Sequence, residues 1–145
     1  MNTNWKHEQT ITDFQNQLYK RCLKHNNDTD ECHKFVLYIS SDPDTWKCAI
    51  CKKIELIQYN KKTNLVKENT KSCVDHYHHD ANGKGPLRGL ICNRCNTIES
   101  KIYTNIDSGK SYQDLINIYG LDLVTKFDTY YSIYNMPFPM DTRDG

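Results

Sequence analysis

Two Cys-x-x-Cys pairs are the residues of this sequence whose type and spacing most directly indicate chemistry. They are Cys48 with Cys51 and Cys92 with Cys95. Each pair can place two thiolates about 2.3 Å from one ion, and four thiolates complete the tetrahedral shell of zinc. A complete shell leaves no position for a substrate, so we expect a structural zinc that contributes to folding. Redox dithiols or buried thiols are the alternative interpretation.

The other three cysteines have no apparent metal partner. The total of seven is odd, and the pairing of four of them favours metal over a disulfide framework. Cys22 and Cys32 fall on apolar helix stripes, where cysteine packs as a small hydrophobe. We assign no function to these two or to Cys73.

A histidine-rich segment, residues 73–80, lies between the two pairs and contains three of the six histidines. On an extended strand Asp75 would face opposite to His76 and His78, unless the strand is kinked. A neutral imidazole titrates near working pH, so His76 is expected to accept a proton from an attacking water.

Oxygen ligands for a second, harder metal ion are also present. Asp75 offers a carboxylate, and Asn96, in the helix that Cys95 enters, offers an amide oxygen. Magnesium prefers such ligands and keeps several waters, with manganese as the alternative ion. Phosphodiester cleavage needs an activated water and neutralised phosphate charge, and this set supplies both. His78 and Arg88 are expected to donate hydrogen bonds to the phosphate.

In their order along the chain, these motifs resemble the bacteriophage recombination endonuclease VII family of His-Me finger (HNH) nucleases. The resemblance covers roughly residues 46–103. It depends on Cys48-x-x-Cys51, on Val74-Asp75-His76-Tyr77-His78, and most specifically on the string from Arg88 to Asn96.

The resemblance implies a ββα-metal fold, with the metal and base assignments given above. It also places His78 and Glu99 at or near the active centre, while His79 has no counterpart. The implied activity is a metal-dependent endonuclease that cuts Holliday junctions or other branched DNA as a homodimer. Residues 111–134 are the candidate dimer interface, although an apolar helix stripe serves equally well as intramolecular core.

Other functions fit parts of the same pattern. One is an HNH nicking or homing-like endonuclease acting on ordinary duplex DNA, which the ββα core alone does not distinguish from a junction enzyme. Another is a non-catalytic zinc module that binds DNA or protein. Its basic residues would be Lys52, Lys53, Lys61, Lys62, Arg88 and Arg94; Arg88 and Arg94 are the DNA contacts expected of the nuclease as well. A third is a second zinc site on the histidines.

The elements that must position these residues indicate an α+β fold, a zinc-stapled ββα-metal core flanked by N- and C-terminal helices. We expect a helical arm over residues 1–46, the nuclease core over 47–103, and helices with a tail over 104–145. Two apolar stripes predict the arm helices. Their members are Ile11, Phe14, Leu18 and Cys22, then Cys32, Phe35, Val36 and Ile39, with an end near Pro43.

Turn and capping signals predict the remaining elements. Residues 54–66 form a hairpin pattern, and residues 87–91 form a returning strand. Ser111 with Asp114 is typical of a capping box, opening a helix that ends at Gly120. Helical spacing continues from Leu123 through Phe127 and Tyr130 to Tyr134, and the prolines of the tail exclude a helix there.

Composition adds limits on partners and location. The 145-residue chain has 19 basic and 18 acidic residues, a net charge of +1, so any contact with DNA must come from local placement. No apolar run approaches the roughly 20 residues needed to cross a bilayer, so no membrane partner is expected. The cysteine usage indicates a reducing, intracellular compartment. For a phage protein this is the cytoplasm of a bacterial host, with a nucleus or viral factory as alternatives.

Overall fold

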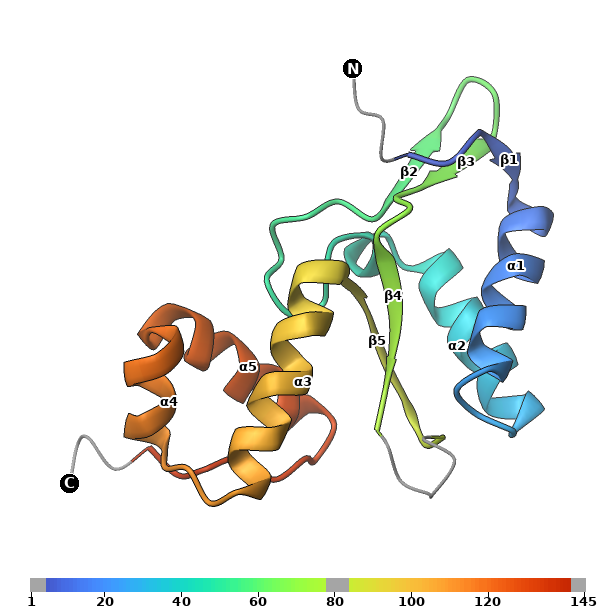
Figure 1. Cartoon of the computed structure of the whole chain (residues 1–145). Helices are drawn as coiled ribbons and strands as arrows, with labels where there is room; N and C mark the ends of the chain where they lie inside the picture. The colour runs from blue at the N-terminus through green and yellow to red at the C-terminus, as the bar shows by residue number, and fades with distance from the viewer. Residues whose placement is uncertain (1–4, 78–83, 142–145) are drawn as a thin grey trace. The chain divides into compact units, whose positions relative to one another are not determined.

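The computed structural model of the chain describes residues 5–77 and 84–141 (Figure 1). This part has an α+β fold, as predicted, and none of its helices is long and apolar enough to cross a membrane. The elements are β1 (Gln9–Thr10), α1 (Ile11–Leu23), α2 (Thr29–Ser41), a 3-10 turn (Pro43–Trp46), β2 (Ile57–Asn60), β3 (Leu65–Glu68), β4 (Ser72–His76), β5 (Leu87–Cys92), α3 (Asn93–Asp107), α4 (Tyr112–Tyr119) and α5 (Leu121–Ile133). β4, β5 and α3 follow one another in the ββα order.

The described residues group into two compact units, each held together by contacts within itself. The first ends at Asn93 and the second begins at Arg94, in the first turn of α3. The predicted division into an arm (1–46), a nuclease core (47–103) and C-terminal helices with a tail (104–145) stays a prediction.

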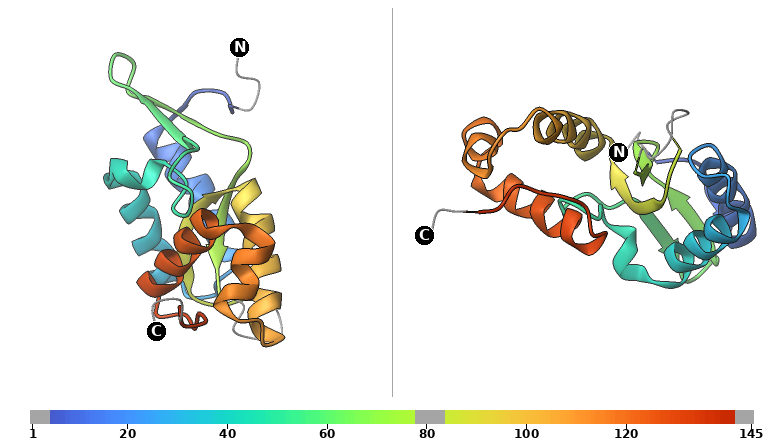
Figure 2. Two further views of the ribbon diagram at one scale, coloured as in Figure 1. Left: turned by 90° about the vertical axis from the view of Figure 1, so that its left-hand side faces the viewer. Right: turned by 90° about the horizontal axis from the view of Figure 1, so that it is seen from below.

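Helices α1 and α2 form an antiparallel pair at the start of the first unit, side by side in Figure 2. The Thr10 side chain caps α1, and the Asp28 side chain caps α2. Both predicted stripes are buried, apart from Ile11, which is half-buried. Burial raises the pKa of the Cys22 thiol to about 12, so this cysteine stays neutral and packs as an apolar side chain.

Two small antiparallel sheets complete the first unit. One has the order β1-β3-β2, and the other is the β4–β5 hairpin. The predicted hairpin at residues 54–66 is confirmed as β2–β3, but its first strand begins only at Ile57. Residues 54–56 are used elsewhere, because the Ile54 carbonyl accepts from the Cys48 N–H and the Leu56 N–H donates to the Trp46 carbonyl.

A buried carboxylate joins the N-terminal arm to the first sheet. Glu68, at the end of β3, is 1% exposed and contacts Arg21 of α1 and Lys6. Ser72 donates a hydrogen bond to the same carboxylate (2.8 Å), and Arg21 also donates to the Ser72 carbonyl (2.9 Å). Burial would raise the pKa of Glu68, but Arg21, Lys6 and Ser72 together lower it below its usual range.

The second unit contains α4 and α5, which pack together within it (Figure 2). The capping box is confirmed, with the Asp114 N–H donating to Ser111 Oγ (3.1 Å) and the Ser111 N–H to Asp114 Oδ2 (2.9 Å). Gly120, with φ 90°, separates the two helices. Tyr112, Leu115 and Val124 form the core cluster of this unit, and Phe127, Tyr130 and Tyr131 of α5 are also buried. Tyr134 lies just beyond α5, and the tail after it is not helical, as predicted.

Candidate functional site

The four cysteines of the two pairs lie together. Cys48 and Cys51 follow the 3-10 turn, Cys92 ends β5, and Cys95 is in the first turn of α3. Their sulfur atoms all lie within 4.8 Å of one another. Three of these side chains are buried, and Cys51 is half-buried.

Backbone hydrogen bonds shape the turn that carries the first pair. The Lys52 N–H donates to the Cys48 carbonyl (3.0 Å), and Lys52 itself has the left-handed φ of 60° that closes such a turn. The Ala49 N–H donates to the Leu90 carbonyl of β5 (3.0 Å). Because Leu90 is two residues before Cys92, this bond brings the first pair next to the second.

The cysteine geometry fits a structural zinc. Sulfur atoms 2.3 Å from a tetrahedral ion are about 3.8 Å apart, within the separation seen here. Four thiolates are the complete ligand set of a structural zinc, so the cluster is compatible with such an ion.

An ion pair lies at the end of the β4–β5 hairpin where β4 stops and β5 begins. The register pairs Val74 with Leu90 and His76 with Leu87, so two residues of β5, Arg88 and the next, lie opposite Asp75. Arg88 Nε is 2.8 Å from Asp75 Oδ2, and Nη2 donates to Asp75 Oδ1 (3.1 Å). The Arg88 side chain is 3% exposed and that of Asp75 is 4% exposed. The bulge thus places Arg88 opposite Asp75, and the guanidinium of Arg88 contacts both carboxylate oxygens.

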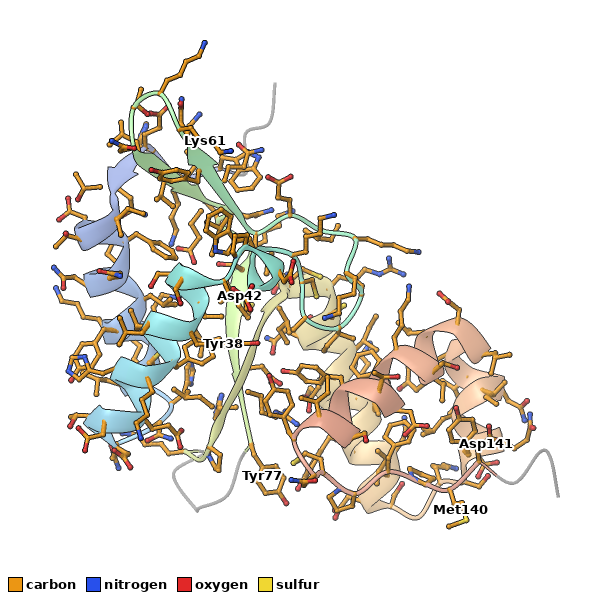
Figure 3. All side chains as sticks on the ribbon, turned by 180° about the vertical axis from the view of Figure 1, so that it is seen from behind. Tyr38, Asp42, Lys61, Tyr77, Met140 and Asp141 are labelled. Carbon is orange, nitrogen blue, oxygen red and sulfur yellow. The ribbon has the colours of Figure 1, made fainter. Side chains whose placement is uncertain are left out.

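His76 follows Asp75 at the end of β4 and is half-buried. Its backbone carbonyl accepts from Arg88 Nη2 (3.3 Å). The imidazole ring stacks on that of His25, with ring centroids 4.2 Å apart and an interplanar angle of 22°. Figure 3 labels Tyr77, the next residue, at the end of the hairpin.

The remaining candidates lie on α3. Arg94 and Asn96 are exposed in its first turn. Glu99, one turn further, is 8% exposed and accepts a hydrogen bond from the Tyr131 hydroxyl of α5 (3.0 Å).

Comparison with known families decides the identity of the chain. The sequence model for recombination endonuclease VII matches residues 36–119. The chain belongs to the recombination endonuclease VII family. No curated protein and no solved structure matches it. Membership makes the chain an endonuclease and indicates DNA as its partner.

The match to recombination endonuclease VII extends beyond the motifs in both directions. It includes the cysteine cluster, Asp75, His76, Asn96 and Glu99, and it continues through α4. Helix α1, the loop after it and helix α5 lie outside the matched segment.

Two expectations fall outside the described residues. His78 and His79 belong to residues 78–83, so the phosphate contact predicted for His78 and the alternative of a second zinc site are not addressed.

Two contacts of the endonuclease were absent from the sequence interpretation. Arg88 pairs with Asp75. The sequence shows only that the two strands of one hairpin carry opposite charges. His25 lies between α1 and α2, and no local pattern connects it with His76.

Proposed function

We propose that this endonuclease is magnesium-dependent and hydrolyses phosphodiester bonds in branched DNA, such as a four-way junction. The observation that carries the proposal is the end of the β4–β5 hairpin. There a carboxylate fixed by an arginine, Asp75, directly precedes a half-buried imidazole, His76. Manganese is the alternative ion.

The roles follow from the chemistry of the side chains. His76 is the general base, which takes a proton from the attacking water at a ring nitrogen. Asp75 and Asn96 would hold the magnesium ion. When bound, that ion neutralises charge developing on the phosphate and the leaving oxygen.

The donor set fits such an ion. Carboxylate and amide oxygens are the protein ligands that magnesium prefers. Each carboxylate oxygen has two lone pairs, so the ion pair with Arg88 leaves Asp75 further acceptor capacity. Asn96 is exposed in the first turn of α3 and is open to solvent ligands. Glu99 is a further candidate on α3 for a role at or near the active centre. The Tyr131 hydroxyl donates to its carboxylate and so restricts its position.

DNA contact is proposed to come from exposed cations. Arg94 is exposed at the start of α3, whereas a contact from Arg88 would compete with Asp75. Figure 3 shows Lys61 in the turn between β2 and β3. The exposed lysines of the first unit include Lys52, Lys53, Lys61 and Lys62.

A homodimer would supply the two cuts that resolve a junction. The apolar stripe of residues 111–134 forms core within the second unit, since Leu115 and Val124 are both 0% exposed. Other apolar side chains remain for a second copy to cover, namely Ile118, Leu121 and Ile133, which are 54%, 47% and 61% exposed. Sedimentation of the wild type and of the triple variant with serine at these positions tests this assignment.

The experiment for the activity is cleavage of a labelled four-way junction and of a linear duplex with the same arms. Each substrate is incubated with magnesium or with EDTA, using wild type, His76→Ala and His33→Ala. His33 is an exposed histidine of α2, so its variant controls for loss of an imidazole elsewhere. Paired magnesium-dependent cuts near the branch, lost only in His76→Ala, are the expected result.

Other results select other functions. Equal cutting of both substrates indicates an HNH endonuclease without junction preference, and no cutting with tight binding indicates a non-catalytic zinc module. Asn96→Ala should abolish cleavage while preserving folding and DNA binding, because Asn96 is exposed. If that variant unfolds, Asn96 has a structural role and its assignment as a metal ligand is wrong.

A further inference from the structure

The loop between α1 and α2 brings a second imidazole against the proposed base. His25 lies in this loop, is half-buried, and stacks on His76 at a centroid distance of 4.2 Å. The loop precedes the segment that matches the family, which begins at residue 36. His25 therefore lies outside the segment that the family model matches.

Hydrogen bonds fix the loop to the strand opposite His76. The His25 carbonyl accepts from the Gly85 N–H (3.0 Å), and the buried Asn26 side chain donates to the Gly85 carbonyl (3.0 Å). Glu31 of α2 accepts from the Leu87 N–H (2.9 Å) and also contacts Asn26. Leu87 is the register partner of His76, so these bonds hold the loop against the start of β5, opposite the proposed base.

Contacts within the loop and with helices α1 and α2 also restrict its conformation. The N–H groups of His25 and Asn26 both donate to the Cys22 carbonyl (2.9 Å each), continuing the end of α1. The Asp28 N–H donates to Asn26 Oδ1 (2.6 Å), and Cys32 Sγ contacts the Asn26 carbonyl (3.6 Å). These bonds restrict the position of the His25 backbone, and with it the ring.

We propose that His25 is a positioning residue for His76, a role that rests on the proposed function of His76 as general base. A near-parallel stack restricts the plane of the His76 ring. It uses the faces of the two rings, while the ring nitrogens lie at the edges. A general base acts only when its nitrogen is within hydrogen-bond reach of the proton that it removes. Fixing the ring plane therefore raises the fraction of molecules ready to react.

A second stack in the same arm provides a matched control. Tyr19 and His33 join α1 to α2 with a centroid distance of 4.3 Å and an interplanar angle of 18°. The geometry matches that of His25 and His76, but neither ring comes from β4 or β5. His33→Ala removes a comparable stack from the helical arm without changing the hairpin.

The test compares six forms of the zinc-loaded 145-residue chain. They are the wild type, His25→Ala, His25→Phe, His25→Leu, His33→Ala and His76→Ala. Cleavage of the labelled junction gives kcat and KM, and gel shift in EDTA gives the Kd for the junction. The His76 ring resonances are recorded without DNA. Zinc content and Tm show which variants fold.

His25→Ala is expected to lower kcat by about threefold to tenfold, the usual effect of losing one aromatic pair, with KM and Kd unchanged. His25→Phe should recover most of kcat, because a flat ring remains, and His25→Leu should not. The His76 ring resonances should shift in His25→Ala and stay in place in His33→Ala.

The contrary results separate this proposal from the proposed function. If His76→Ala abolishes cleavage while His25→Ala keeps the wild-type kcat, His25 has no positioning role and the nuclease assignment stands. If His25→Leu recovers kcat as fully as His25→Phe, the loop needs only apolar bulk and the stacking proposal is overturned; this comparison decides even if His25→Ala does not fold. If His76→Ala cleaves like the wild type, the base assignment is wrong and the role of His25 falls with it.

Discussion

Replacing Arg88 by methionine removes one side of the buried ion pair at the end of the β4–β5 hairpin. The two side chains are 3% and 4% exposed, and both carboxylate oxygens of Asp75 contact the guanidinium. Water therefore compensates poorly for the lost partner. Breaking a buried pair from one side costs about 3–5 kcal/mol, because the remaining charge stays buried without compensation. This loss is a large part of the roughly 5–15 kcal/mol that stabilises a typical domain.

The assay is a double-mutant cycle in urea, at fixed zinc and without DNA. Arg88→Met and Asp75→Asn are each expected to lose several kcal/mol of unfolding free energy. The double variant should lose much less than the sum, because it leaves no unpaired charge. Junction affinity is measured in parallel on the folded fraction.

A small, additive loss in the cycle would refute this reasoning. If Arg88→Met kept wild-type stability and weakened junction binding with a reduced salt dependence, Arg88 would be a phosphate contact, as the sequence first indicated. The same variants therefore distinguish the two roles of one arginine.

Three further outcomes are expected. Cys92→Ser should release zinc and unfold the first unit, and metal analysis showing full zinc stoichiometry would remove the cluster as a zinc site. Arg21 and Lys6 lower the pKa of the buried Glu68 carboxylate in the folded state. The carboxylate therefore contributes fully to stability above its unfolded-state pKa of about 4.3. This contribution is lost as the pH falls through the lower folded-state pKa. The Tm of Glu68→Gln should therefore fall less between pH 5 and pH 3 than the Tm of the wild type, with both proteins measured under the same zinc conditions. Ser111→Ala should cost about 1 kcal/mol by removing the cap of α4, which helicity and urea unfolding will measure; an unchanged midpoint would mean that the cap contributes little.

Local patterns predict most of the elements because they depend on neighbours in sequence. The stripes from Ile11 and Cys32 identify α1 and α2, and Ser111 with Asp114 identifies the start of α4. The cysteine pairs are predicted for the same reason, since Cys-x-x-Cys is a local turn.

Contacts between distant segments could not be read in this way. The strand alternation gave the faces of β4 but not the bulge in β5, which places Arg88 opposite Asp75. Helix α2, the 3-10 turn and strands β2 and β3 separate His25 from the strand that carries His76, and His25 lies in a loop without periodicity. Its position depends on Gly85 and Glu31, whose contacts exist only once the arm has packed.

The buried carboxylate of β3 bears on whether the family segment is autonomous in this protein. Glu68 lies inside the matched residues 36–119, but both of its cationic partners, Lys6 and Arg21, precede them. A truncated chain that begins at residue 36 would keep the anion and discard its counterions. We therefore expect removal of residues 1–35 to destabilise the fold, and transplanting the nuclease segment to another protein would require replacing Glu68 as well.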